Sequence, residues 1–280
     1  MKHICLNLKR FDVPVSLGGV NRIAPAADWG AYIVERTEEA LRSYNSGEAE
    51  FTMYFPEAHI LGAAAASKDG PVRIGCQGVY RENTASGGNF GAFTTNRPAS
   101  AAKALGCESV IIGHCEERRD KLGIMELGGT ADAEAVNRIL NSEIRAAVSE
   151  GMDVLYCIGE TEEEQPRWKE ILKQQLTVGL ESVDKSRTVI AYEPVWAIGP
   201  GKTPPCRDYI AKIAGYIKEV TGGMDVIYGG GLKQDNAGML ASIPEIDGGL
   251  IALTRFSGEI GFYPDEYLEI IRIYMENCRQ

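Results

Sequence analysis

Short apolar runs recur along the chain and alternate with polar segments. Eight runs are rich in β-branched or other apolar residues and predict strands at 3–8, 50–55, 72–76, 109–113, 153–159, 188–193, 225–230 and 249–254. Most are continuously apolar rather than alternating, which is typical of strands buried on both faces of a parallel sheet. Segments between them have helical periodicity, most clearly at 131–151, 163–183, 207–220 and 264–278.

Eight strands alternating with helices over 280 residues match the count and length of a (β/α)8 barrel, an α/β fold. The alternative is a doubly wound open sheet, which does not need eight strands and usually has a glycine-rich turn after its first strand. Here the first strand continues into LNLKRFD. No Pro-, Ser- or Gly-rich linker divides the chain, so we expect one domain, residues 1–280.

Three predicted strand-to-helix connections are long: 10–30, 78–100 and 254–264. In a barrel, such loops lie on the face formed by the carboxyl ends of the strands, where functional sites are built. Their length therefore points to that face. For 10–30, plain surface elaboration remains an equal alternative.

Composition narrows the ligand classes. The chain carries 39 acidic and 29 basic side chains, a net charge of -10, which argues against a broad surface for nucleic acid or an anionic membrane. No apolar run approaches the length of a membrane span, and the N-terminus lacks a signal-peptide pattern, so we expect a cytoplasmic protein. The seven cysteines lack CxxC spacing, which favours reduced thiols. Without a metal-ligand cluster or a nucleotide-binding glycine signature, we expect no metal and no cofactor.

Polar residues stand at the ends of three predicted strands. The first strand supplies Asn7 and Lys9, the fourth His114 and Glu116, and the sixth Glu193. Each alone is typical of a cap, a turn or a surface charge. If the strand ends converge, however, a base, a hydrogen-bond donor and a cation meet in one place. This combination suits proton abstraction next to a carbonyl, followed by reprotonation.

The chain resembles the triosephosphate isomerase family along nearly its whole length. The motifs that carry the resemblance are LNLK (6–9), GAFT (91–94), IIGHCEERR (111–119), CIGET (157–161), AYEPVWAIGPGKT (191–203), YGGGLKQDN (228–236) and IDGGLIALT (246–254). The resemblance implies a TIM barrel and a cofactor-free aldose–ketose isomerase of glycolysis and gluconeogenesis. Such an enzyme interconverts dihydroxyacetone phosphate and glyceraldehyde 3-phosphate through an enediol.

The resemblance also implies a role for each strand-end residue. Glu193 matches the catalytic base, and His114 matches a neutral imidazole that donates to the substrate's carbonyl oxygen. Lys9 matches the cation that attracts the anionic substrate. Asn7 orients the substrate beside it, and Glu116 pairs with the lysine.

The segment 194–203 matches a mobile lid that excludes water from the reaction. Its backbone N–H at Gly199 is expected to donate to the substrate's phosphate. Pro200 stands where the family usually has threonine, so we expect a stiffer lid. The expected lid residues are Pro194, Val195, Trp196, Ala197, Ile198, Gly201, Lys202 and Thr203.

The phosphate end departs from the family. Ala252 and Leu253 stand where the family has a glycine pair, and Gly231 replaces a serine. Backbone N–H groups at these positions and at Gly230 can still donate, although a Cβ restricts close approach. Arg255, in a loop longer than the family's, is a candidate phosphate ligand; a solvated loop arginine is the alternative.

These departures leave three functions open: the triose phosphate isomerase, an isomerase of a related sugar phosphate such as an erythrulose phosphate, and a catalytically silent binding barrel. The complete set of strand-end residues argues against the third. Cys115 replaces the serine that usually follows the histidine; a nucleophilic role is not expected, because His114 is not placed to act as its base. We expect a homodimer that docks through the loop around Phe93 and Thr94, although that loop lacks the family's glycine-glutamate pair.

Overall fold

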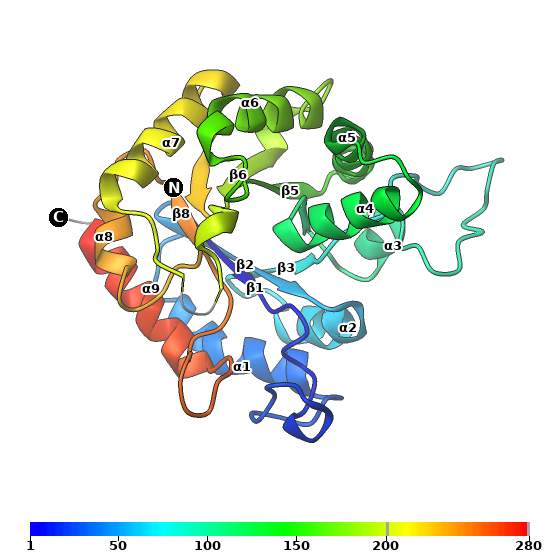
Figure 1. The fold of residues 1–280 in the computed structure, drawn as a ribbon. Coiled ribbons are helices and arrows are strands. Elements are labelled where there is room, and N and C mark those ends of the chain that lie inside the picture. The colour runs from blue at the N-terminus through cyan, green and yellow to red at the C-terminus, as the bar shows by residue number, and fades with distance from the viewer. Residues whose placement is uncertain (200–201, 279–280) are drawn as a thin grey trace.

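The computed structural model describes residues 1–199 and 202–278 and contains a closed barrel of eight parallel strands (Figure 1). Neighbouring strands pair in chain order, and the barrel closes where His3 to Leu6 pair with Gly248 to Ile251. The predicted (β/α)8 barrel and all eight strands are confirmed. The strands are β1 (Lys2–Asn7), β2 (Ala49–Phe55), β3 (Val72–Cys76), β4 (Ser109–Ile112), β5 (Asp153–Ile158), β6 (Thr188–Tyr192), β7 (Val226–Tyr228) and β8 (Gly248–Ile251).

Helices surround the barrel (Figure 1). The four that the sequence predicts most clearly are present. One of them, predicted from residue 163, begins later, at Trp168, because Pro166 lies in a preceding 3-10 turn, Gln165–Arg167. The helices are α1 (Trp29–Leu41), α2 (Glu57–Ala66), α3 (Ala99–Ala104), α4 (Cys115–Leu127), α5 (Ala133–Ser149), α6 (Trp168–Gly179), α7 (Arg207–Thr221), α8 (Ala237–Ala241) and α9 (Pro264–Cys278).

The apolar residues form two buried layers. One lies inside the barrel, where side chains such as Cys5, Ile111 and Leu250 meet. The other lies between the strands and the helices and includes Ile4 and Leu6 from the same strand. Successive side chains of a strand point to opposite faces, and here both faces are covered. This explains why the strands are continuously apolar in sequence.

The two long loops at the start and the end of the chain contact each other. The β1–α1 loop, residues 8–28, contains a 3-10 turn at Val15–Leu17, and the β8–α9 loop folds back through a bridge between Arg255 and Gly261. Arg22 Nη1 donates to the carbonyl of Ile260 at 2.9 Å. The segment after β1 therefore contacts the β8–α9 loop, and we call these two loops together the rim.

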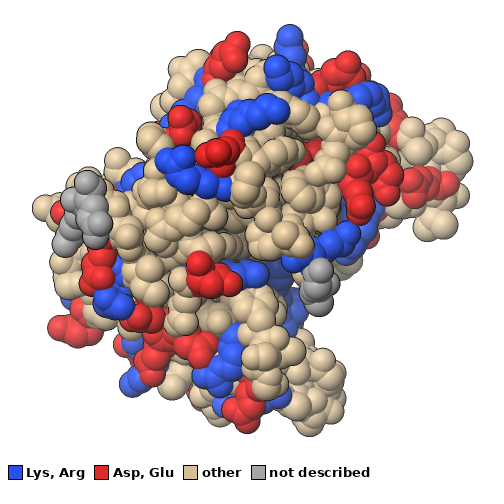
Figure 2. Space-filling model, turned by 60° about the vertical axis from the view of Figure 1, so that its left-hand side comes forward, with Lys and Arg blue, Asp and Glu red and all other residues tan. Residues whose placement is uncertain are grey.

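The loop between β3 and α3 projects away from the barrel (Figure 1), and its Phe90 is 82% exposed. Acidic and basic side chains are interspersed on the face drawn in Figure 2. All seven cysteines lie in the described part of the chain and are free thiols, as the sequence predicts. Within residues 1–199 and 202–278, no helix is both long and apolar enough to cross a lipid bilayer.

Candidate active site

The carboxyl ends of β1, β3 and β4 border a pocket of about 190 Å³. Parallel strands deliver their carboxyl ends to one face of the barrel, so polar residues that are distant in sequence become neighbours there. The pocket is lined by Asn7, Lys9, Arg10, Gln77, Ile111, His114, Glu116 and Glu117. A larger depression, about 580 Å³, lies around Ser142, Arg145 and Asp184, away from these strand ends.

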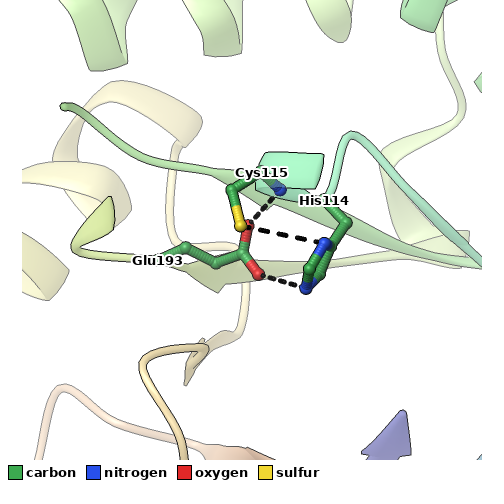
Figure 3. A group of neighbouring side chains, drawn as sticks. All are labelled: His114, Cys115 and Glu193. Atoms are coloured by element: carbon green, nitrogen blue, oxygen red, sulfur yellow. Dashed lines mark hydrogen bonds and ion pairs between the residues drawn. The ribbon is translucent and has the colours of Figure 1, made fainter. Parts of the chain in front are cut away.

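Glu193 follows β6 and is only 1% exposed. Its Oε2 accepts the backbone N–H of Cys115 at 2.8 Å, and its Oε1 lies 3.2 Å from Nε2 of His114 (Figure 3). Burial raises the pKa of the Glu193 carboxyl, against the opposing effects of His114 and the Cys115 N–H. A buried carboxylate with a raised pKa and few hydrogen bonds is suited to accept a proton from carbon.

Two glycines make room for this carboxylate. A Cβ at Gly229 would lie 2.8 Å from Cγ of Glu193, and one at Gly159 would lie 1.8 Å from its carbonyl oxygen. Both distances are shorter than real contacts between such atoms allow. The chain after β5 and β7 therefore approaches Glu193 closely because these positions carry no side chain.

His114 caps the N-terminus of α4. Its Nδ1 accepts the backbone N–H of Glu116 at 3.2 Å. A neutral imidazole carries one proton, so a ring whose Nδ1 accepts has its proton on Nε2. Nε2 is the nitrogen that faces Glu193, so the helix cap orients a donor toward the site.

Lys9 has an uncommon backbone conformation, with φ at 42°. Its N–H donates to Oδ1 of Asn7 at 3.0 Å, and Nε2 of Gln77 donates to its carbonyl at 3.0 Å. Its ammonium lies 2.8 Å from Oε1 of Glu116. Such strained conformations persist where surrounding contacts fix them, often at functional sites.

Sequence reasoning missed Gln77. It follows β3, and besides Lys9 its amide donates to Oδ1 of Asn7 at 3.3 Å and to the carbonyl of Tyr54 at 3.2 Å. The signal that could have found it is the one that identified Asn7: a polar residue at the carboxyl end of a buried strand. The structure thus brings together all five predicted strand-end residues and adds this amide.

The expected lid begins as a 3-10 turn, Val195–Ala197, directly after Pro194. Ile198 and Gly199 continue the chain, and Lys202 lies 3.1 Å from Oε2 of Glu162. Thr203 is exposed, whereas Gly201 and Pro200 lie outside the described residues.

A second missed residue, Glu160, contacts the expected lid segment. Its side chain is completely buried, and burial raises its pKa. Oε1 accepts from Nε1 of Trp196 at 2.8 Å, from the hydroxyl of Tyr192 at 2.9 Å and from that of Tyr209 at 3.3 Å. One carboxylate therefore links the end of β6, the lid and α7.

The candidate phosphate-binding residues lie after β7 and β8. Gly230 and Gly231 follow Tyr228, and Ala252 and Leu253 follow Ile251. Gly231 has φ at 99°, and Gly199 of the lid has φ at 121°, conformations that favour glycine.

Arg255 is already engaged by its own loop and by α9. Its Nε and Nη2 donate to Oε1 of Glu266 at 2.8 and 2.5 Å, and its guanidinium lies 4.0 Å from the centre of the Tyr263 ring. Its Nη1 lies 4.0 Å from Oε2 of Glu259, so a phosphate bound through Nη1 would lie beside acidic side chains. The structure thus shows a partner for Arg255 that the sequence did not reveal.

Cys115 begins α4 beside the catalytic candidates. Its Sγ is 3.8 Å from Nδ1 of His114. Burial and the Glu193 carboxylate raise the pKa of the thiol to about 12. A thiol held protonated is a poor nucleophile, in agreement with the expectation that Cys115 does not act as one.

Comparison with known proteins identifies the family. A model of the triosephosphate isomerase family matches residues 29–272. Triosephosphate isomerase of Marinobacter nauticus is 33% identical over 245 residues, which cover 83% of this chain and 87% of that protein. Triosephosphate isomerase of Pelodictyon phaeoclathratiforme is 36% identical over 196 residues, which cover 66% of this chain and 70% of that protein. A crystal structure of triosephosphate isomerase from Bartonella henselae superposes with a TM-score of 0.71 at 21% identity, covering 98% of each chain, and supports the fold. The chain belongs to the triosephosphate isomerase family.

Proposed function

We propose that this protein is a cofactor-free aldose–ketose isomerase that interconverts dihydroxyacetone phosphate and glyceraldehyde 3-phosphate. The observation that carries the proposal is the facing pair formed by the buried Glu193 carboxylate and Nε2 of His114, 3.2 Å apart. A substrate between them meets a base on one side and a neutral donor on the other.

In the proposed reaction, Glu193 removes the proton from the carbon that bears the hydroxyl, and the C–H electron pair forms the enediolate double bond. The former carbonyl electrons move to oxygen, where the Nε2–H of His114 stabilises them. Return of this proton to the neighbouring carbon, together with transfer of the hydroxyl proton from the first oxygen to the former carbonyl oxygen, completes the isomerisation. Lys9 attracts the substrate's negative charge, and Asn7 orients the substrate beside it.

Glu116 fits this scheme as the partner of Lys9, since their side chains are 2.8 Å apart. We assign the phosphate to backbone N–H groups of the lid and of the two glycine- and alanine-containing loops. The assigned positions are Gly199, Gly230, Gly231, Ala252 and Leu253. Arg255 would join this set through Nη1, the guanidinium nitrogen that does not bond to Glu266.

The lid is proposed to close over the bound substrate and exclude water, because an enediolate exposed to water loses its neighbouring phosphate group by elimination. Closure must release or carry along the bond between Trp196 and Glu160, which is 2.8 Å long here. We also propose a homodimer, because the β3–α3 loop projects from the barrel with Phe93 packed 5.4 Å from the Tyr80 ring and Thr94 exposed.

Purified protein tests the function directly through turnover of the two triose phosphates. Glu193→Gln keeps the side-chain shape but removes the base, so we expect kcat to fall by about 10²- to 10⁴-fold. Glu219→Gln, an exposed change on α7, is the matched control and should turn over like the unaltered protein. Retention of most activity by Glu193→Gln would refute the assigned mechanism.

The rim formed by the two long loops motivates a second candidate, a four-carbon keto-sugar phosphate. Arg22 and Ile260 join these loops, and a longer substrate would extend toward such a rim. The ratio of kcat/KM for a tetrulose phosphate and for the triose phosphate separates the two candidates. A protein that turns over neither, although correctly folded, would instead be a silent binding barrel.

A further inference from the structure

The active-site face contains a cluster of three potential metal ligands. One ligand atom from each of His114, Cys115 and Glu193 lies within 4.8 Å of the others. Figure 3 shows the thiol and the imidazole on adjacent residues at the start of α4, with the carboxylate reaching them from the end of β6. The fold, rather than a sequence motif, creates this cluster.

The three ligand types suit a thiophilic divalent cation. Thiolate, imidazole and carboxylate together bind Zn²⁺ and similar ions, with metal–ligand bonds of about 2.0–2.3 Å. In a tetrahedral site such bonds place two ligand atoms about 3.3–3.8 Å apart. Sγ of Cys115 is 3.8 Å from Nδ1 of His114, and Nε2 is 3.2 Å from Oε1 of Glu193. The two separations involve different ring nitrogens, and one ion binds only one of them, so the thiol or the carboxylate must move toward that nitrogen when the ion binds.

A second observation points to a missing partner at this position. Oε1 of Glu193 is buried and accepts no hydrogen bond from the described residues, although Nε2 of His114 is near. The whole residue is 1% exposed. The nearby Nε2 of His114 does not meet hydrogen-bond geometry with this oxygen, which leaves a buried carboxylate oxygen unsatisfied at a cost in free energy, and a cation would satisfy it.

We propose that His114, Cys115 and Glu193 form an inhibitory binding site for a thiophilic divalent cation such as Zn²⁺. The ion replaces the thiol proton: a metal–sulfur bond forms, the S–H bond breaks, and one proton passes to solvent without any change of oxidation state. The imidazole binds the ion through the nitrogen that carries no proton and keeps its own proton on the other nitrogen, the carboxylate supplies the third ligand, and the fourth position is left for water. The bound ion occupies the proposed base and donor together, so isomerisation stops.

The thiol makes the site specific to this chain. A serine hydroxyl at position 115 would be a much poorer ligand for a soft cation than a thiolate. Cys115→Ser therefore removes the distinguishing ligand with little change in size and leaves the backbone N–H that binds Glu193 in place.

Metal binding can be measured without reference to turnover. Titration of the purified protein with Co²⁺ should produce a thiolate-to-metal charge-transfer absorption, and calorimetry with Zn²⁺ should give one site per chain. Cys115→Ser should lose the absorption and bind Zn²⁺ at least about 10-fold more weakly, since even loss of an outer-shell partner commonly costs that much. Cys206→Ser, which alters an exposed thiol, is the control and should bind like the unaltered protein.

Inhibition provides the second readout. Zn²⁺ should inhibit the unaltered protein and Cys206→Ser reversibly, with activity restored by a chelator, and should inhibit Cys115→Ser only at higher concentration. Each variant is compared with its own uninhibited rate. Equal Zn²⁺ affinity in all three proteins, or no stoichiometric binding, would overturn the proposal. If the protein lacks isomerase activity, the Co²⁺ and calorimetric results still decide whether the site exists.

Discussion

The anchoring of the lid by Glu160 leads to a quantitative prediction. Trp196→Phe keeps an aromatic ring against Tyr209, whose ring is 5.7 Å away, but removes the Nε1–H that donates to Glu160 at 2.8 Å. Tyr192 and Tyr209 still donate to the same oxygen. The variant therefore removes one hydrogen bond from the lid and leaves the carboxylate partly satisfied.

The size of the effect follows from the kind of bond. Three donors meet at Oε1, as expected for an ionised acceptor, and a hydrogen bond to a charged group contributes about 1.5–3 kcal/mol. At 1.36 kcal/mol per factor of ten, the equilibrium for detaching the lid should shift by about 10-fold to about 150-fold. The amides of Ala197 and Ile198, which bond to Pro194 and Val195 within the turn, should lose protection by the same factor.

Hydrogen exchange followed by mass spectrometry on peptides covering 194–199 measures this change. Tyr209→Phe serves as the control, because it removes a longer bond, 3.3 Å, whose donor lies on α7 and not in the lid. That control should change lid exchange much less. Exchange in Trp196→Phe within about twofold of the unaltered protein would refute the view that Glu160 holds the lid.

Three further variants test other parts of the structure. Burial raises the pKa of the Glu143 carboxyl to about 8. Its contribution to the free energy of unfolding is therefore complete at acidic pH and is lost as pH rises through about 8. Urea unfolding should show this decline in the unaltered protein but not in Glu143→Gln, and parallel pH profiles of the two proteins would contradict the prediction. In Gly229→Ala, the new Cβ would lie 2.8 Å from Cγ of Glu193. Displacement of the base should reduce kcat by about 10²-fold in a turnover assay. An unaffected kcat would show that the backbone at the end of β7 moves and that Glu193 stays in place. Arg255→Ala breaks the contact with Glu266 and should lower the melting temperature slightly with little change in KM, while a large rise in KM would establish Arg255 as a phosphate ligand.

The barrel and its strand-end residues could be predicted because both follow from local patterns. A strand covered on both faces is apolar at most positions, and parallel strands around a barrel end on one face. The proximity of Asn7, His114 and Glu193 could therefore be predicted from their positions at the ends of such strands alone. The family motifs then supplied their proposed roles.

The remaining contacts depend on tertiary structure. Glu160 acquires its role from donors on β6, the lid and α7, the farthest of them Tyr209, and no local spacing indicates that they meet. Arg255 reaches Glu266 because its loop turns back through the bridge to Gly261. Cys115 was noted only as a replacement for serine, because its proximity to Nδ1 of His114 requires the geometry of the helix start.

The closure between β1 and β8 has a consequence for how the chain folds. Contacts across this closure join residues far apart in sequence: Lys2 donates to the carbonyl of Ile246 across 244 positions, and Arg22 to that of Ile260 across 238. Such contacts recover little free energy until the entropy of closing a very long loop has been overcome, so they form late. Until then β1 and β8 are open edge strands and can pair with another chain. The hydrogen bond between Arg22 and Ile260 lies across the same junction. This bond should therefore slow the separation of β1 from β8 and limit aggregation from partly folded chains.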